Sequence, residues 1–197
     1  MKKMPCVFVR QFDGPRAATI TREVTPAAQW VVDGEGQAFI KRDGTACAVI
    51  GGVLHKRYDA KRGKAAPANA IPCDVPDEVT GHHPHWVPVD ANNPADKWHV
   101  EAWARVSAAL DNGTYELCGP HFNGNPEGYV ADFFVRHDSE PAEIWHGNVP
   151  RDFDGLQAFL DDWMHEGIVF HHPDGRMAKI RRVDFGFPRN ANKGLQP

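Results

Sequence analysis

Residues that form turns punctuate the whole sequence, and their density limits the folds that the chain can adopt. The 197 residues include 18 glycines and 16 prolines. Several glycines stand in the turn-forming pairs Asp33-Gly34, Asp43-Gly44 and Gly51-Gly52. Glycine and proline interrupt long helices, and such pairs connect neighbouring antiparallel strands. The sequence therefore disfavours a helical bundle and predicts a fold of many short elements.

Short apolar or alternating runs between these turns predict β-strands. We expect the runs between 30 and 58 to form an antiparallel meander joined by Asp-Gly and Gly-Gly turns, and the last two runs to form a hairpin. The expected strands cover 7–9, 30–32, 37–41, 45–50, 53–58, 86–89, 115–118, 129–135, 166–170 and 177–184.

Two segments have apolar residues at helical spacing. The first covers 95–110, where apolar residues recur at steps of three and four. The second covers 153–164 and begins after a capping aspartate, Asp152 or Asp154. With the strands, these helices place the chain in the α+β class, built mainly from antiparallel sheet.

The composition is that of a globular chain with an acidic balance. Hydrophobic residues make up 42%, charged residues 24%, and the formal net charge is −4. No apolar run approaches the roughly 20 residues that span a bilayer, and no secretory signal opens the sequence. We therefore expect one domain over residues 1–197, a cytoplasmic location, no membrane contact and no obligate protein partner. Any phosphate binding must come from local basic clusters, which occur at 55–64 and 176–189.

One of the predicted strands ends in a lysine that is suited to nucleophilic chemistry. The segment Lys41-Arg42-Asp43-Gly44-Thr45 has the pattern K-x-D-G-T. A free lysine amine, with a pKa of about 10.4, is protonated and a poor nucleophile, but neighbouring cations lower that pKa. Lys179 and Arg181 alternate on a predicted strand and so share one face. Taken alone, K-x-D-G is also common in surface hairpins.

Further segments follow Lys41 in a fixed order. They are Lys56-Arg57-Tyr58, Tyr115-Glu116-Leu117, Glu166-Gly167-Ile168-Val169 and Lys179-Ile180-Arg181. This order resembles motifs I, Ia, III, IV and V of the lysine-dependent nucleotidyltransferases, the superfamily of polynucleotide ligases and capping enzymes. The segments 41–47, 116–120 and 166–171 are similar to the small stand-alone 5′-to-3′ RNA ligase family. The likeness extends over about residues 35–188.

The resemblance implies a fold, an activity and a set of substrates. It implies an ATP-grasp-like nucleotidyltransferase domain whose antiparallel sheets are flanked by helices, with no OB domain after motif V. It also implies an ATP-dependent RNA ligase that joins RNA 5′-phosphate and 3′-hydroxyl ends. The reaction would pass through a lysyl-AMP intermediate and an adenylylated RNA 5′ end, with Mg²⁺ or Mn²⁺ as the metal.

Four residues receive roles at the reacting phosphate by this resemblance. Lys41 would attack the α-phosphate of ATP and hold AMP. Glu166 resembles the motif IV carboxylate that helps to hold the metal or its water. Lys179 and Arg181 resemble the motif V pair that grips the α-phosphate, although the wider superfamily carries Lys-x-Lys where this sequence has Lys-x-Arg.

Two more residues receive roles toward the nucleotide and the RNA. Arg57 resembles the motif Ia arginine that contacts the nucleotide phosphate or the RNA 5′-phosphate. Glu116 resembles the motif III carboxylate that accepts hydrogen bonds from ribose hydroxyls. Larger relatives stack an aromatic ring on adenine from the strand after motif III, where this sequence has Phe133 and Phe134. Either ring, or both, can instead pack in the core.

Other activities are compatible with parts of the pattern. A DNA ligase or a GTP-using capping enzyme would share the motifs, but the accessory domain of those enzymes is not expected here. A non-catalytic nucleotide-binding or RNA-binding module of the same fold would not need Lys41, Glu166 and Lys179 together. An ATP-dependent RNA ligase is therefore the leading interpretation.

Overall fold

A computed structural model describes residues 4–13, 16–78, 81–137 and 143–189 of the chain. These residues divide into two compact units. The Lys41 unit contains 4–13, 16–43 and 143–189, and the Glu116 unit contains 44–78 and 81–137. Because the boundary falls between Asp43 and Gly44, it passes through the K-x-D-G segment. Each unit is described by itself.

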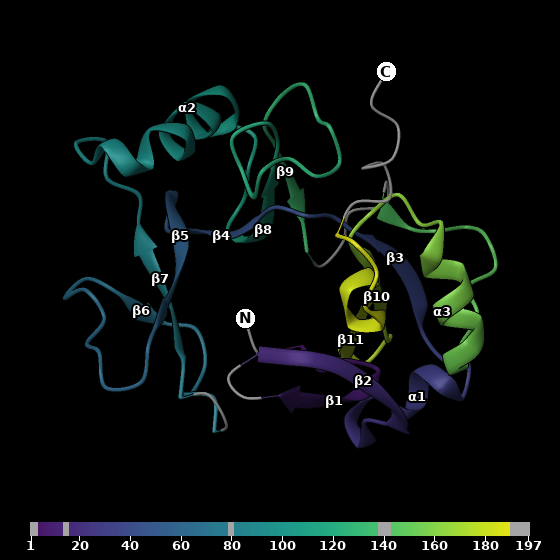
Figure 1. Cartoon of the computed structure of the whole chain (residues 1–197). Coiled ribbons are helices and arrows are strands. Elements are labelled where there is room, and N and C mark those ends of the chain that lie inside the picture. The colour runs from purple at the N-terminus through teal and green to yellow at the C-terminus, as the bar shows by residue number, and fades with distance from the viewer. Residues whose placement is uncertain (1–3, 14–15, 79–80, 138–142, 190–197) are drawn as a thin grey trace. The chain divides into compact units, whose positions relative to one another are not determined.

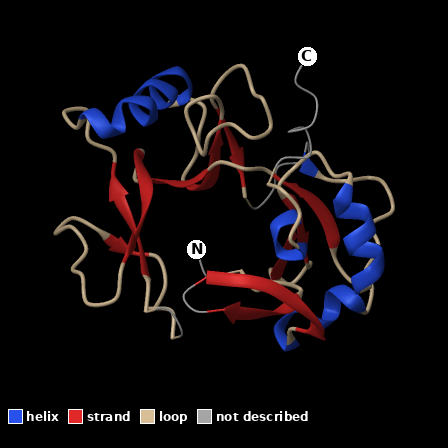
Figure 2. Ribbon diagram, in the orientation of Figure 1, coloured by secondary structure: helices blue, strands red, loops and turns tan. Residues whose placement is uncertain are grey.

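The Lys41 unit contains two antiparallel sheets. Strands β11, β10 and β3 form a three-stranded sheet with β10 in the centre, and β1 pairs with β2. The α-helices and strands are labelled in Figure 1, and all elements are coloured by type in Figure 2. They are β1 (Phe8–Asp13), β2 (Arg16–Val24), η1 (Pro26–Ala28), α1 (Gln29–Val32), β3 (Gln37–Lys41), α3 (Phe153–Asp161), β10 (Gly167–His171), β11 (Met177–Arg181) and η4 (Arg182–Phe185).

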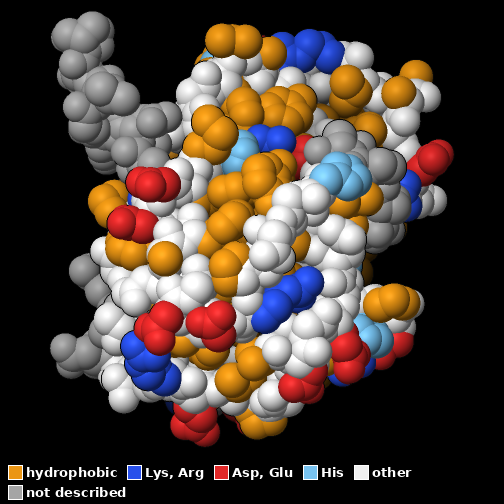
Figure 3. All heavy atoms as spheres, turned by 90° about the vertical axis from the view of Figure 1, so that its right-hand side faces the viewer, with side chains coloured by type: hydrophobic (Ala, Val, Ile, Leu, Met, Phe, Trp, Pro, Cys, Tyr) orange, Lys and Arg blue, Asp and Glu red, His pale blue; other side chains and the backbone are white. Residues whose placement is uncertain are grey.

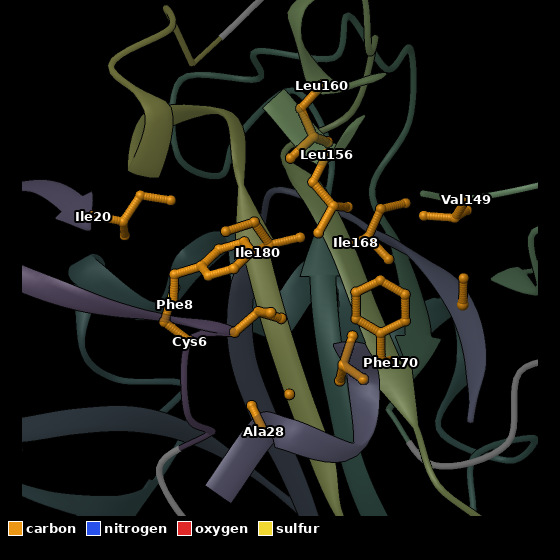
Figure 4. Close-up of a cluster of buried hydrophobic side chains, with 14 of the residues drawn as sticks. Cys6, Phe8, Ile20, Ala28, Val149, Leu156, Leu160, Ile168, Phe170 and Ile180 are labelled. Carbon is orange, nitrogen blue, oxygen red and sulfur yellow. The ribbon is translucent and has the colours of Figure 1, made fainter. Parts of the chain in front are cut away.

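One face of the three-stranded sheet forms the core of this unit. Alternate residues of β10 and β11, including Ile168, Phe170 and Ile180, are fully buried and belong to one cluster with Leu156 and Leu160 of α3. Figure 4 shows these side chains gathered together. Because successive strand residues point to opposite faces, the residues between them, among them the predicted site lysines, lie on the other face.

The Glu116 unit is built on a six-stranded antiparallel sheet. Its strand order is β6-β7-β5-β4-β8-β9. Helix α2 covers one face, where Ala102 packs in a cluster with Cys47, Leu54 and Leu117. The elements are β4 (Thr45–Ile50), β5 (Val53–Ala60), β6 (Ile71–Pro72), β7 (His83–Pro88), η2 (Pro94–Asp96), α2 (Lys97–Val106), β8 (Gly113–Cys118) and β9 (Phe133–Arg136).

The predicted α+β class with mainly antiparallel sheet is confirmed in the described residues. The β4–β5 hairpin across Gly51-Gly52 and the final β10–β11 hairpin are also as predicted. Asp152 is the N-cap of α3, and its Oδ1 accepts a hydrogen bond from Gly155 N at 2.9 Å. The ATP-grasp-like assignment and the single domain over 1–197 stay predictions.

Two expectations about the first half of the chain are wrong. Residues 30–32 belong to the short helix α1 rather than to a strand, because an apolar run of three residues carries no period that separates helix from strand. Asp43-Gly44 does not close a hairpin. Strand β3 pairs with β10, whereas β4 pairs with β5 and β8, so the chain changes sheets at this turn.

The surface and the helices add two further observations. On the face shown in Figure 3, acidic and basic side chains are interspersed with apolar ones. None of the helices in the described residues has the length and apolar character that a membrane crossing requires. The cytoplasmic location remains a prediction.

Candidate functional site

Lys41 is the last residue of β3 and stands in register with residues of both neighbouring strands. Gly167 of β10 lies opposite Lys41 on one side and opposite Arg181 of β11 on the other. The three residues therefore form one row across the sheet. Lys41 and Arg181 alternate with the buried residues of their strands, so both cations lie on the face opposite the core, which is called the open face of this sheet. Glycine in the middle leaves no side chain between Lys41 and Arg181.

Glu166 lies beside both of these cations. It immediately precedes β10, and its Oε2 accepts a hydrogen bond from Lys41 Nζ at 2.5 Å. Its Oε1 lies 3.6 Å from Arg181 NH1. The Lys41 and Glu166 side chains are only 18% and 11% exposed, so this pair is largely shielded from water. The Glu166 carboxylate thus faces two cations.

Lys179 is the third cation on this face, and none of the described carboxylates forms an ion pair with it. It lies two residues before Arg181 on β11, opposite Val169. Burial, together with the nearby charges of Lys41, Arg181 and Arg10, lowers the pKa of Lys179 to about 8. Within the described part of the chain, no hydrogen bond or ion pair is made by its Nζ. A partly buried cation in this state is suited to binding an anion.

Asp184 fixes the position of Arg181. Its carboxylate accepts hydrogen bonds from Arg181 NH2 at 2.9 Å and from Arg10 NH2 at 2.8 Å, and its Oδ2 accepts one from the Arg181 backbone N at 2.9 Å. Although burial alone would raise it, these arginine contacts hold the pKa of Asp184 below its usual range. No sequence motif marks Arg10 or Asp184, because their contact joins residues near the two ends of the chain.

The other charged residues of the K-x-D-G segment are also paired. Arg42 donates to Glu143 from Nε at 2.6 Å and from NH2 at 3.1 Å. The buried carboxylate of Asp43 accepts two hydrogen bonds from the guanidinium of Arg189. Asp43 and Arg42 are thereby held by residues more than one hundred positions away, which orients the end of β3 that carries Lys41.

Glu116 and Arg57 share one face of the six-stranded sheet. Glu116 on β8 pairs with Ala46 on β4, and the next residue of β4, Cys47, pairs with Lys56 on β5. Arg57 therefore points to the same side as Glu116 and Ala46, away from α2. The Arg57 guanidinium lies 5.8 Å from the ring centroid of Trp86.

Both residues already have polar partners. Glu116 Oε1 accepts a hydrogen bond from Gly44 N at 3.1 Å, and Glu116 Oε2 lies 3.0 Å from His137 Nε2. Arg57 Nε donates to Asp59 Oδ1 at 2.7 Å. The two predicted residues of the Glu116 unit are thus fixed by hydrogen bonds that the sequence did not indicate.

The two phenylalanines of β9 lie on opposite faces. Phe134 packs against the core of the Glu116 unit, with its ring centroid 6.1 Å from that of Tyr115. Phe133 pairs with Cys118 on the other face, where its ring meets Tyr129 edge-on at 4.8 Å. Phe133 is therefore on the same side of the sheet as Glu116.

Two basic positions outside the motifs have structural partners. Arg182 is buried, and its NH1 donates to the carbonyls of Asp161 at 2.6 Å and Trp163 at 2.9 Å, at the C-terminal end of α3. Arg176 pairs with Asp174 at 2.8 Å. Not every cation of the basic cluster at 176–189 is therefore available for a phosphate.

Comparison with known proteins identifies relatives. RNA ligase 1 of Rattus norvegicus is 29% identical to the chain over 144 residues, covering 57% of this chain and 43% of that protein. RNA ligase 1 of Danio rerio is 30% identical over 140 residues, with the same two coverages of 57% and 43%. The chain is a distant homologue of RNA ligase 1. The predicted relation to RNA ligases is confirmed.

The limits of this homology are also measurable. RNA ligase 1 of Mus musculus is 31% identical over 144 residues, which cover 57% of this chain and 42% of that protein. The chain thus spans less than half the length of the RNA ligase 1 proteins that it matches. No protein-family model matches the chain. The homology therefore relates this chain to RNA ligase 1 without assigning roles to its individual residues.

Proposed function

We propose that this chain is an ATP-dependent RNA ligase with an ATP-grasp-like nucleotidyltransferase domain over residues 1–197. One observation carries the proposal: Glu166 holds the Lys41 amine on a sheet face that also presents Lys179, which forms no ion pair with any described carboxylate. A lysine nucleophile needs a proton acceptor, and the phosphate it attacks needs cations. The homology to RNA ligase 1 supports RNA as the polymer joined.

In the first step, the Lys41 amine attacks the α-phosphorus of ATP. A P–N bond forms, the P–O bond to pyrophosphate breaks, and AMP remains on Lys41 as a phosphoramidate. Glu166 Oε2, at 2.5 Å from Nζ, takes the proton that the amine must lose. Lys179 and Arg181 offset the negative charge that grows on the α-phosphate oxygens.

Two transfers to RNA complete the reaction. An oxygen of the RNA 5′-phosphate attacks the phosphorus of lysyl-AMP, the P–N bond breaks, and the RNA end becomes adenylylated. The 3′-hydroxyl of a second RNA end then attacks that 5′-phosphate, releases AMP and forms a phosphodiester. The proposed role of Arg57 is to bind the RNA 5′-phosphate or the nucleotide phosphate, for which a guanidinium is suited.

A divalent metal fits the residues that are present. Among the described residues, no group of three or more His, Cys, Asp or Glu side chains is arranged to hold a metal ion. Mg²⁺ does not need such a group, because it usually binds one or two carboxylates, substrate phosphates and several waters. Glu166 would supply the carboxylate. When bound, Mg²⁺ or Mn²⁺ neutralises charge on the triphosphate.

Two residues of the Glu116 unit are proposed to bind the nucleoside. Glu116 would accept hydrogen bonds from ribose hydroxyls. Phe133 is the better candidate to stack on adenine, because Phe134 is packed in the core. Base stacking on an aromatic ring is worth about 1–3 kcal/mol, so loss of the Phe133 ring should weaken nucleotide binding.

The test compares nucleotides and then polymers. The protein is incubated with Mg²⁺ and α-labelled ATP or GTP, and covalent label is measured after denaturing electrophoresis. RNA or DNA with 5′-phosphate and 3′-hydroxyl ends is then supplied. We expect labelling from ATP and sealing of RNA. Labelling from GTP would indicate a capping-type enzyme, sealing of DNA alone a DNA ligase, and no labelling a non-catalytic binding module.

A further inference from the structure

His137 occupies a defined place beside Glu116. It follows β9, and its backbone N donates to the carbonyl of Thr114 on β8 at 3.1 Å. This bond extends the pairing of the two strands by one residue. Val135 stands opposite Glu116, so His137, two residues further, shares its face and lies diagonally across from Glu116. The ring is brought within hydrogen-bond distance by the strand pairing itself.

The ring of His137 completes the hydrogen bonding of the Glu116 carboxylate. Its Nε2 lies 3.0 Å from Oε2, while Oε1 accepts the Gly44 N–H at 3.1 Å. Two donors from different segments thus fix both oxygens and set the plane of the carboxylate. A carboxylate oxygen can accept more than one hydrogen bond, so each oxygen keeps the capacity to accept a ligand hydroxyl.

The surroundings of the other ring nitrogen, Nδ1, favour one neutral tautomer of His137. Nδ1 is buried and has no hydrogen-bond partner among the residues that the structure describes. Of the two neutral tautomers, the one with hydrogen on Nε2 lets the ring donate to Glu116 and leaves no buried N–H without an acceptor. The surroundings therefore favour a ring that is a donor toward Glu116.

We propose that His137 is a positioning residue that orients Glu116 for the nucleotide ribose. This inference deepens the proposed function and rests on it, because it takes Glu116 as the acceptor for ribose hydroxyls. His137 acts through Glu116, so its loss should affect ribose recognition and leave the attack by Lys41 intact. The hydrogen-bond donor at Nε2 matters more than the shape of the ring, because the ring contacts Glu116 Oε2 through that donor.

The activity test compares His137→Leu with His137→Gln, which places an amide donor near the position of Nε2. Lysyl-AMP formation is measured with ATP and with 2′-deoxy-ATP. His137→Leu should raise the KM for ATP about tenfold, as the loss of about 1.4 kcal/mol of binding would, with little change in kcat. The KM for 2′-deoxy-ATP should rise less than the KM for ATP, because one of the ribose hydroxyls that Glu116 would bind is already missing. His137→Gln should restore most of the affinity for ATP.

His121 supplies a matched control in the same unit. Its Nδ1 lies 2.8 Å from Asp132, so it also contacts a carboxylate. His121→Leu should leave the ratio of the two KM values unchanged. Equal losses for both nucleotides in His137→Leu, or failure of His137→Gln to recover ATP affinity, would overturn the positioning role.

A second measurement separates this inference from the proposed function. Imidazole nitrogen NMR of the unliganded protein reports the tautomer of His137, and it is repeated on Glu116→Gln. We expect the Nε2–H tautomer and a shift of its signals in Glu116→Gln. The Nδ1–H tautomer, or no response to Glu116→Gln, refutes the contact. Wild-type protein that forms no adduct with ATP refutes the proposed function, and the NMR result then still decides whether His137 holds Glu116.

Discussion

The two larger sheets differ in the partners available to the charged groups on the face opposite each core. On the three-stranded sheet, Lys179 has no ion-pair partner among the described residues, and its pKa is lowered to about 8 by burial and neighbouring cations. On the six-stranded sheet, Glu116 has a hydrogen-bond donor at each oxygen. One face holds unbalanced positive charge, and the other holds a carboxylate that is fixed in place.

The difference indicates that the two faces are suited to different chemical groups of a ligand. Repelling cations cost free energy in the unliganded protein, and a bound anion relieves that cost. A pre-oriented carboxylate instead offers directional hydrogen bonds to a neutral hydroxyl. The three-stranded sheet is therefore suited to phosphate, and the face with Glu116 to ribose.

The largest expected effect follows from removing the charge of Glu166. Glu166→Gln keeps the shape but leaves Lys41 and Arg181 without the carboxylate that faces both. Lysyl-AMP formation should slow by about 10²–10³-fold, a range typical for losing one preorganised electrostatic group, while circular dichroism stays unchanged. Asp154→Asn, which removes the partner of Arg22, should retain full activity. A fully active Glu166→Gln would remove Glu166 from the reaction.

Lys179→Met separates binding from stability. Adduct formation should fall by about 10²-fold, because a cation at the phosphate is lost. Stability at pH 7 should rise by about 1–3 kcal/mol, since the folded state no longer holds a charged lysine whose pKa is lowered. In the wild type, the charged Lys179 destabilises the folded state. This destabilisation disappears as pH rises from about 8, the folded pKa, toward the unfolded pKa of about 10.4. The gain should therefore shrink over that window.

Urea unfolding at pH 7 and at pH 9.5 measures this gain. The exposed Lys97, which lies 3.8 Å from Glu101, provides the matched control, and Lys97→Met should change stability by less than about 0.5 kcal/mol. A Lys179→Met variant less stable than wild type at pH 7 would show that burial and the nearby cations do not make the charged Lys179 destabilising.

Arg57→Ala tests the Glu116 unit. Sealing of RNA with 5′-phosphate ends should fall about tenfold, as expected for loss of one charge-assisted phosphate contact. Gel-based sealing assays compare it with Arg105→Ala, which removes a cation that pairs with Asp132. If both variants seal RNA like wild type, Arg57 is a surface residue with no role in ligation.

The smallest expected effect concerns the covered side of the three-stranded sheet. Asp152→Ala removes the side-chain cap of α3, whose leucines pack against that sheet. Stability should fall by about 1 kcal/mol, with adduct formation per folded molecule unchanged. Thermal unfolding and labelling of the same sample measure both. A selective loss of labelling would mean that the open face depends on the α3 cap.

Local patterns predicted much of the fold. Strand β3 and the β10–β11 hairpin were predicted because alternation and turn residues mark them locally. The partner of β3 was not predictable, since β10 lies more than one hundred residues away. The turn at Asp43-Gly44 has hairpin chemistry, yet the chain leaves the sheet there. Arg189 holds Asp43, and Glu116 accepts from Gly44 N, and neither contact has a local signal.

In the site too, local patterns were predictable from the sequence, whereas contacts between distant segments were not. Strand alternation predicted that Lys179 and Arg181 share one face, and Lys41 was assigned by its motif. The register brings Lys41 and Arg181 to either side of Gly167. The positions of Arg10 and His137 depend on contacts between distant segments. No residue type or spacing marks them, so they became visible only in the folded chain.

The site of covalent labelling decides whether Lys41 is the nucleophile that receives AMP. Wild-type protein is incubated with ATP and Mg²⁺, digested, and analysed by tandem mass spectrometry under conditions that preserve P–N bonds. We predict one AMP on Lys41 and no adduct in Lys41→Arg. AMP on another residue, or a Lys41→Arg variant that is still labelled, would contradict this prediction.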